Sequence, residues 1–143
     1  MNVPGRILAL DVGDVRIGVA VSDETRTIAQ PASVYTRVGY GPDSRHILAL
    51  CEQYQTRDVV LGLPLNMNGT RGPQAEKAIA FGNVLANAGL NVQYIDERMT
   101  TVTAEQTLID GGVRREDRRR YVDKLAAAVI LEQWLASGGR TQP

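Results

Sequence analysis

The chain has 143 residues, of which 43% are hydrophobic and 22% are charged, with 16 lysines and arginines balancing 16 aspartates and glutamates. This length and apolar content are typical of one globular domain that buries a core without disulfides or a structural metal. The single cysteine, Cys51, excludes an internal disulfide and favours a reducing compartment. The zero net charge excludes a chain that is basic throughout, so contacts with nucleic-acid phosphates would have to come from a local patch.

The sequence carries no sign of export or membrane insertion. Its first five residues lack the basic region and the apolar run of a signal peptide. No apolar stretch approaches the roughly 20 residues that are needed to cross a bilayer. We therefore expect a cytoplasmic protein without a membrane segment.

The N-terminal part of the chain predicts three strands in a meander. Apolar runs at 6–10 and 17–21 flank the turn sequence Asp11-Val12-Gly13, which is typical of a hairpin. A third stretch at about 32–38 alternates weakly and can pair with the second strand. Pro31 would lie at the start of that strand or on a sheet edge, because proline cannot donate a hydrogen bond to a neighbouring strand.

Helices and strands alternate after the meander. Apolar spacing and turn residues predict strands at 59–63 and 92–95 and helices at 44–55, 73–88, from about 103 to 111, and 121–136. Such alternation favours parallel strands joined by crossover helices. The sequence therefore predicts an α/β domain over residues 1–137, with a mixed five-stranded sheet flanked by helices, and a flexible tail at 138–143.

Acidic residues that are distant in the sequence are expected to meet at one edge of this sheet. Asp11 ends the first expected strand, and Asp96 and Glu97 end the fifth, so parallel strands would bring them to the carboxyl edge, where α/β proteins place their sites. Asp123 is expected in the first turn of the last helix, on the apolar stripe that contains Ala127. A carboxylate on such a stripe costs free energy unless it is paired, protonated or bound to a metal.

A cluster of these carboxylates would suit hard divalent cations such as magnesium and manganese. Two such ions can activate a water molecule and stabilise the leaving oxygen of a phosphodiester, whereas without metal the acids would repel one another. Each acid alone also fits a simpler explanation. Asp11 fits a turn former, Glu97 a solvated charge at a strand end, and Asp123 an acid favoured at a helix N-terminus.

Five arginines lie between residues 114 and 120, immediately before the last expected helix. A local basic patch can hold a nucleic-acid backbone even on a neutral protein. A solvated loop explains the run equally well.

Four motifs in the sequence resemble those of the YqgF/RuvX family of ribonuclease H-like nucleases, which are related to Holliday junction resolvases. The resemblance extends from Leu8 to Leu135. The motifs are LDVGDVRIGVAVSD at 10–23, LGLPLNMNGT at 61–70, DERMTT at 96–101 and VDKLAAA at 122–128. One departure is visible, since Asn68 stands where the family often has aspartate.

The resemblance implies a sheet with strand order 3-2-1-4-5 and a metal-dependent nuclease that uses two Mg²⁺ or Mn²⁺ ions. It assigns catalysis and metal binding to Asp11, Glu97 and Asp123. It also implies processing of the 5′ end of pre-16S ribosomal RNA in ribosome biogenesis, with resolution of four-way DNA junctions as the alternative. Beside these acids, the candidate contacts to nucleic acid are Arg16, Arg98, Arg115, Arg119 and Lys124. For Arg98 and Lys124, ion pairing with the neighbouring acids is an equal explanation.

Two other classes of function fit the sequence less well. An actin-like or sugar-kinase ATPase needs two domains with Asp-x-Gly hairpins, and this chain has room for one. A non-catalytic nucleic-acid-binding module would not need all three acids. RNA is favoured over structured DNA on the resemblance alone, and a partner from ribosome assembly could supply specificity. The sequence leaves a monomer and a homodimer open, although a junction resolvase should be a two-fold dimer.

Overall fold

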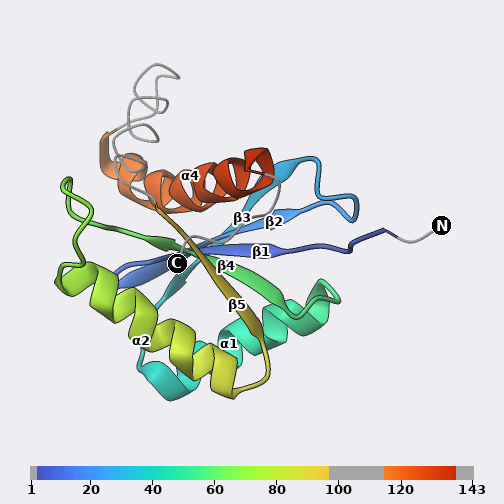
Figure 1. The fold of residues 1–143 in the computed structure, drawn as a ribbon, viewed down its shortest axis with the longest axis horizontal. Helices are drawn as coiled ribbons and strands as arrows, with labels where there is room; N and C mark the ends of the chain where they lie inside the picture. The colour runs from blue at the N-terminus through green and yellow to red at the C-terminus, as the bar shows by residue number, and fades with distance from the viewer. Residues whose placement is uncertain (1–2, 97–114, 138–143) are drawn as a thin grey trace.

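A computed structural model of the chain describes residues 3–96 and 115–137, and of residues 115–124 it describes only the backbone. Figure 1 shows one sheet with helices α1 and α2 on one face and helix α4 on the other. The strands are β1 (Leu8–Val12), β2 (Arg16–Ser22), β3 (Ala29–Thr36), β4 (Asp58–Leu63) and β5 (Asn91–Asp96), and the helices are α1 (Tyr40–Gln53), α2 (Pro73–Asn87) and α4 (Arg115–Ala136). No helix in this part of the chain is long and apolar enough to cross a membrane.

The sheet has the order β3-β2-β1-β4-β5, which confirms the expected order 3-2-1-4-5. The meander β1-β2-β3 is antiparallel, whereas β4 pairs in parallel with both β1 and β5. Pro31 lies on the edge strand β3, as predicted. It pairs with Ala20, next to a shift in register between Val19 and Ala20.

Side-chain alternation along the strands divides the core into two layers. Leu8 and Leu10 of β1 point toward α1 and α2, where the same cluster contains Ile47 and Phe81. The intervening residue Ala9 belongs to the cluster on the α4 face. That cluster consists of Ile7, Ala9, Ala20, Val60, Ile95, Ala127, Ala128, Ile130, Leu131 and Trp134. Full burial of each large apolar side chain contributes about 1.5–3 kcal/mol, so both faces of the sheet stabilise the fold.

Two helices begin earlier than the sequence predicted. Helix α1 starts at Tyr40 rather than at residue 44. Pro42 lies in its first turn, where a proline loses no intrahelical hydrogen bond, so it does not prevent this earlier start. Helix α4 starts at Arg115 rather than at residue 121, so the arginine-rich segment from 115 onward is helical and not a loop. Arginine favours helices, and this preference outweighs the polar composition that suggested a loop. The helix expected at about 103–111 lies outside the described residues.

The longer α4 changes the position of Asp123. This residue is the ninth of the helix and not part of its first turn, so that prediction was wrong. The dipole at a helix N-terminus acts within about one turn. It therefore cannot explain an acid at this position.

We expect Gly82→Ala to destabilise the protein by about 1–3 kcal/mol, the usual cost of overpacking a core. A Cβ on Gly82 of α2 would lie 2.1 Å from the hydroxyl oxygen and 2.9 Å from Cζ of Tyr94 on β5. Tyr94 is partly buried and packs against the core between helix and sheet, so moving its ring aside would cost packing contacts. Urea unfolding measures the loss. Tyr94→Phe in the same chain should restore part of it by removing the closest atom, and an equal loss in both backgrounds would contradict this account.

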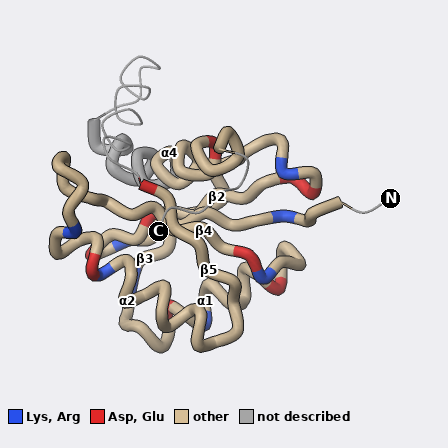
Figure 2. Tube along the Cα trace, viewed as in Figure 1, with Lys and Arg blue, Asp and Glu red and all other residues tan. Residues whose placement is uncertain are grey.

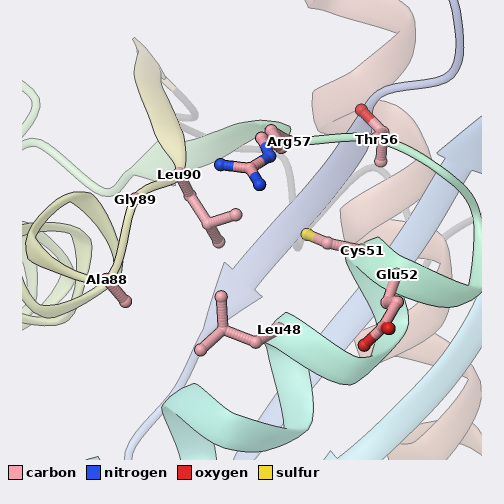
Figure 3. A pocket seen from close by; sticks show the side chains of 8 residues that line it. All are labelled: Leu48, Cys51, Glu52, Thr56, Arg57, Ala88, Gly89 and Leu90. Carbon is pink, nitrogen blue, oxygen red and sulfur yellow. The ribbon is translucent and has the colours of Figure 1, made fainter.

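We also expect the thiol of Cys51 to react slowly in the folded protein. Cys51 is 3% exposed and lines a cavity of about 370 Å³ together with Leu48, Arg57 and Leu90 (Figure 3). Burial raises the pKa of this thiol from 9.0 to about 11, so at pH 8 the reactive thiolate is reduced by about 100-fold. Alkylation by iodoacetamide should accelerate strongly in urea. Equally fast alkylation without urea would show that the thiol of Cys51 is accessible in the folded protein, which would contradict the prediction.

The same shift gives a pH dependence of stability. The folded state keeps the thiol of Cys51 protonated at a pH where the unfolded chain has lost this proton. The contribution to the free energy of unfolding is therefore complete below pH 9 and declines as the pH rises toward about 11.

Candidate active site at the carboxyl edge of the sheet

The parallel strands end on the side of the sheet where α4 begins. In Figure 1, β1 and β4 run toward the left, and the orange N-terminal part of α4 lies over that same side. The chain leaves the meander on one side of β1 and returns to β4 on the other side. Such a reversal of strand order is where open α/β sheets bind their ligands, beyond the carboxyl ends of the strands.

Asp11 occupies this position on the face that α4 covers. It follows Ala9 by two residues on β1, and residues two apart on a strand share a face. Asp11 is half-buried. Gly18 is its register partner on β2, so this neighbour adds no side chain beside the carboxylate. The sequence thus placed Asp11 correctly at the carboxyl end of the first strand.

Asp96 lies at the carboxyl end of β5, opposite Leu63 of β4, but it belongs to the other face of the sheet. Tyr94, two residues before it, packs on the side of α1 and α2. On the α4 side, Gln93 accepts a hydrogen bond of 3.0 Å from Nε1 of Trp134. The structure therefore does not bring Asp96 and Asp11 onto one face. Glu97 lies outside the described residues.

Helix α4 brings a third sequence position to this edge. Its buried stripe includes Ala127, Ile130 and Trp134, which pack on the sheet. Asp123 precedes Ala127 by four residues, so it occupies the same stripe one turn closer to the helix N-terminus. Only its backbone position is described.

The expected nucleic-acid contacts fall partly within the described residues. Arg16 is the first residue of β2 and is half-buried. Arg115, Arg119 and Lys124 belong to the N-terminal half of α4, where only the backbone is described. Arg98 lies outside the described residues.

The turn between β1 and β2 is fixed to its surroundings by side chains that no sequence motif had indicated. Asp14 accepts hydrogen bonds from Nζ of Lys77 at 2.9 Å and from Nε2 of Gln74 at 3.0 Å. The hydrogen bond from Lys77, more than that from Gln74, holds the pKa of the Asp14 carboxyl below its ordinary value. On the other side of the turn, the Arg37 guanidinium donates to the carbonyl of Gly13 at 2.9 Å. No local pattern marks these residues, because their partners are far away in the sequence.

Charges of both signs are mixed over the described part of the molecule. Figure 2 shows the Lys and Arg segments next to Asp and Glu segments rather than gathered on one face. Within residues 3–96 and the described side chains of α4, no three His, Cys, Asp or Glu side chains lie together as a metal site. Of the three expected ligands, only Asp11 is among the side chains that are described.

Comparison with known proteins places this arrangement in a family. The family model RuvX, described as Holliday junction resolvase, matches residues 5–137. A protein of Clostridioides difficile named "Putative pre-16S rRNA nuclease" is 46% identical over 132 residues, which cover 92% of this chain and 94% of that protein. A protein of the same name from Lactococcus lactis subsp. cremoris is 48% identical over 134 residues, covering 91% and 93%.

Solved structures agree on the fold. The structure of T. thermophilus RuvC in complex with a Holliday junction substrate matches with a TM-score of 0.60 at 16% identity, over 96% of this chain and 98% of RuvC. The large terminase nuclease of phage G20c matches with a TM-score of 0.53 at 13% identity, over 87% and 82%. These likenesses confirm the ribonuclease H-like fold. The family model over residues 5–137 and the relatives at 46% and 48% identity show that the chain belongs to the RuvX family of nucleases.

Proposed function

We propose that this protein hydrolyses phosphodiester bonds at the carboxyl edge of its sheet, with Asp11, Glu97 and Asp123 as the ligands of two divalent cations, Mg²⁺ or Mn²⁺. The observation that carries the proposal is the position of Asp11. Asp11 is a half-buried residue on the α4 face, at the reversal of strand order where this class of sheet places its sites.

The chemistry of the donor set fits these cations. Carboxylate oxygens are hard ligands that magnesium and manganese prefer, and Asp11 is a carboxylate at the carboxyl end of β1. Bound cations would supply an activated water and charge stabilisation for the leaving oxygen. The protein's own part is to hold the acids and the scissile phosphate in place, so no serine, cysteine or histidine nucleophile is required.

The alternation of side chains along β5 and the residue spacing of helix α4 support Glu97 and Asp123 as the other two ligands. Gln93 and Ile95 of β5 face α4, so continued alternation would put Glu97, rather than Asp96, on the face of Asp11. Asp123 belongs to the helix stripe that packs on this face. Three acids would then be contributed by β1, by the end of β5 and by α4.

Basic residues beside these acids would neutralise the phosphate backbone. Arg16 begins β2 directly after the Asp11 turn, and Arg98 follows Glu97 in the sequence. Arg115 and Arg119 are one helical turn apart in α4. Lys124 follows Asp123, and it would either contact the phosphate or pair with an acid of the site.

We take pre-16S ribosomal RNA as the substrate and residues 1–137 as the nuclease domain, with 138–143 as a tail that the chemistry does not need. The names of the relatives support this choice of substrate. The similarity to RuvC supports only the fold, so a four-way DNA junction is the second substrate to be tested. A ribosome-assembly partner would supply the specificity for one site in the RNA.

The test compares three labelled substrates of similar length: an RNA that contains the 5′ leader of 16S RNA, an unstructured RNA and a four-way DNA junction. Each is incubated with Mg²⁺, Mn²⁺ or a chelator. Metal-dependent cleavage of the leader RNA supports the proposal. Paired symmetric cuts in the junction would instead assign the protein to recombination, and a two-fold dimer in solution should accompany them. Cleavage that persists in chelator would contradict the cation site.

A further inference from the structure

A buried ion pair holds the turn that follows Asp11. Asp43 is fully buried, and Arg37, whose side chain is 14% exposed, donates from Nε to its Oδ2 at 2.9 Å. The Arg37 guanidinium also donates from Nη1 to the carbonyl of Gly13 at 2.9 Å. The backbone N–H of Arg37 donates to the carbonyl of Val15 at 2.8 Å. One residue therefore holds both ends of the segment Gly13–Val15, two residues beyond Asp11.

The ion pair is itself fixed from several directions. The second carboxylate oxygen of Asp43 accepts a hydrogen bond of 2.8 Å from the backbone N–H of Val38. Burial alone would raise the pKa of the Asp43 carboxyl, but the Val38 N–H and the Arg37 guanidinium outweigh burial and hold the pKa below its ordinary value. The guanidinium carbon of Arg37 lies 5.5 Å from the ring centre of Tyr40 and 5.3 Å from that of Phe81. The Arg37 guanidinium thus makes its contacts within the protein, and we do not expect it to bind a phosphate of the substrate.

We propose that Arg37, held by Asp43, is a positioning residue that sets the place of Asp11 and thereby the cation affinity of the site. This inference rests on the proposed function. A buried ion pair is weak evidence for stability, because apolar residues of similar volume often stabilise a core as well. The planar guanidinium of Arg37 instead donates hydrogen bonds to the carboxylate of Asp43 and to the carbonyl of Gly13 at the same time. Lysine, with one nitrogen, does not reproduce this arrangement.

The experiment is a titration of Mn²⁺ into the full chain without nucleic acid, with free Mn²⁺ measured by electron paramagnetic resonance. Arg37→Lys should weaken Mn²⁺ binding by about 10- to 100-fold, the usual effect of removing a residue that orients a metal ligand. Thermal unfolding is recorded for each variant, and all titrations are made below the onset of unfolding. If Arg37→Lys does not fold, Asp43→Asn replaces it, because this change keeps the carbonyl oxygen that accepts from Val38 and weakens only the hold on Arg37.

The chain offers a matched control at the opposite end of β1. Arg26 donates from Nε to the carbonyl of Gly5 at 2.8 Å, pairs with Asp58 at 2.5 Å and lies 5.6 Å from the ring centre of Trp134. It therefore makes the same three kinds of contact, far from Asp11 along the strand. Arg26→Lys should lower the melting temperature and leave Mn²⁺ binding unchanged.

Asp11→Asn separates a failure of this inference from a failure of the proposed function. If Asp11→Asn binds Mn²⁺ like the wild type, the cation site itself is wrong. If Asp11→Asn loses binding while Arg37→Lys keeps it, only the positioning role is overturned. An unchanged Mn²⁺ affinity with a raised KM for RNA would make Arg37 a phosphate contact. If Arg26→Lys weakened Mn²⁺ binding as much as Arg37→Lys, the loss of affinity would reflect general destabilisation of the fold, and the inference would be overturned.

Discussion

Asp11→Asn is expected to lower the rate of nucleic-acid cleavage by about 100- to 1,000-fold, because cation charge is worth several kcal/mol in the transition state and each 1.4 kcal/mol is about tenfold in rate. Asparagine keeps the size of the side chain, so the half-buried position on β1 should accept it without loss of fold. The measurement is the single-turnover rate at saturating Mn²⁺ and at a series of lower concentrations. A change of ligand charge should raise the Mn²⁺ requirement as well as lower the rate.

Asp14→Asn is the matched control for this change. Asp14 lies three residues from Asp11, but its side chain is 53% exposed and paired with Lys77. We expect this variant to cleave at nearly the wild-type rate. A loss as large as that of Asp11→Asn would mean that any acid in the turn matters, and the assignment of Asp11 as a cation ligand would then fail.

Glu97→Gln should also abolish most cleavage, by on the order of 100-fold, whereas its neighbour Asp96→Asn should have little effect. The reason is strand parity: Tyr94 and Asp96 share the face of α1 and α2, and Asp11 lies on the face of α4. Both variants remove one negative charge and keep side-chain size, so they differ only in the face of the sheet on which each acid would lie. Cleavage rates and circular dichroism spectra of the two proteins test this directly.

The opposite result would be informative. If Asp96→Asn were the inactive variant and Glu97→Gln the active one, the strand alternation would have to break after Ile95. The donor set would then consist of Asp11, Asp96 and Asp123, gathered from both faces around the end of the sheet.

Much of the fold could be predicted from the sequence, because local signals agreed with the final packing. The apolar runs at 6–10 and 17–21 become parts of the paired strands β1 and β2, although β1 continues through Asp11 and Val12 of the expected turn sequence. Pro31 lies on an edge strand, as its missing N–H requires. Helix starts were less predictable. The polar composition of residues 115–120 suggested a loop, but the helix preference of arginine outweighs it, and α4 begins at Arg115.

The candidate site was predictable only in part. The position of Asp11 follows from strand alternation, and that of Asp123 on the α4 stripe follows from helical spacing. The positioning role of the Arg37–Asp43 ion pair was not predictable. It depends on a hydrogen bond from Arg37 to the carbonyl of Gly13, which lies in a turn 24 residues earlier in the chain. Contacts of this kind appear only when the sheet and α1 are packed together.

The order in which α4 and the sheet are synthesised has a consequence for when this protein can act. A chain emerges from the ribosome N-terminus first, so Ile7 and Ala9 of β1 exist long before Ile130 and Trp134, which cover them. Until α4 is synthesised, the apolar side chains on its face of the sheet stay exposed, and chaperones bind exposed apolar surface of this kind. The proposed site cannot be complete either, because Asp123 arrives with the same helix. Such a nuclease would be inactive during its synthesis on the ribosome and would gain activity only when α4 packs on the sheet.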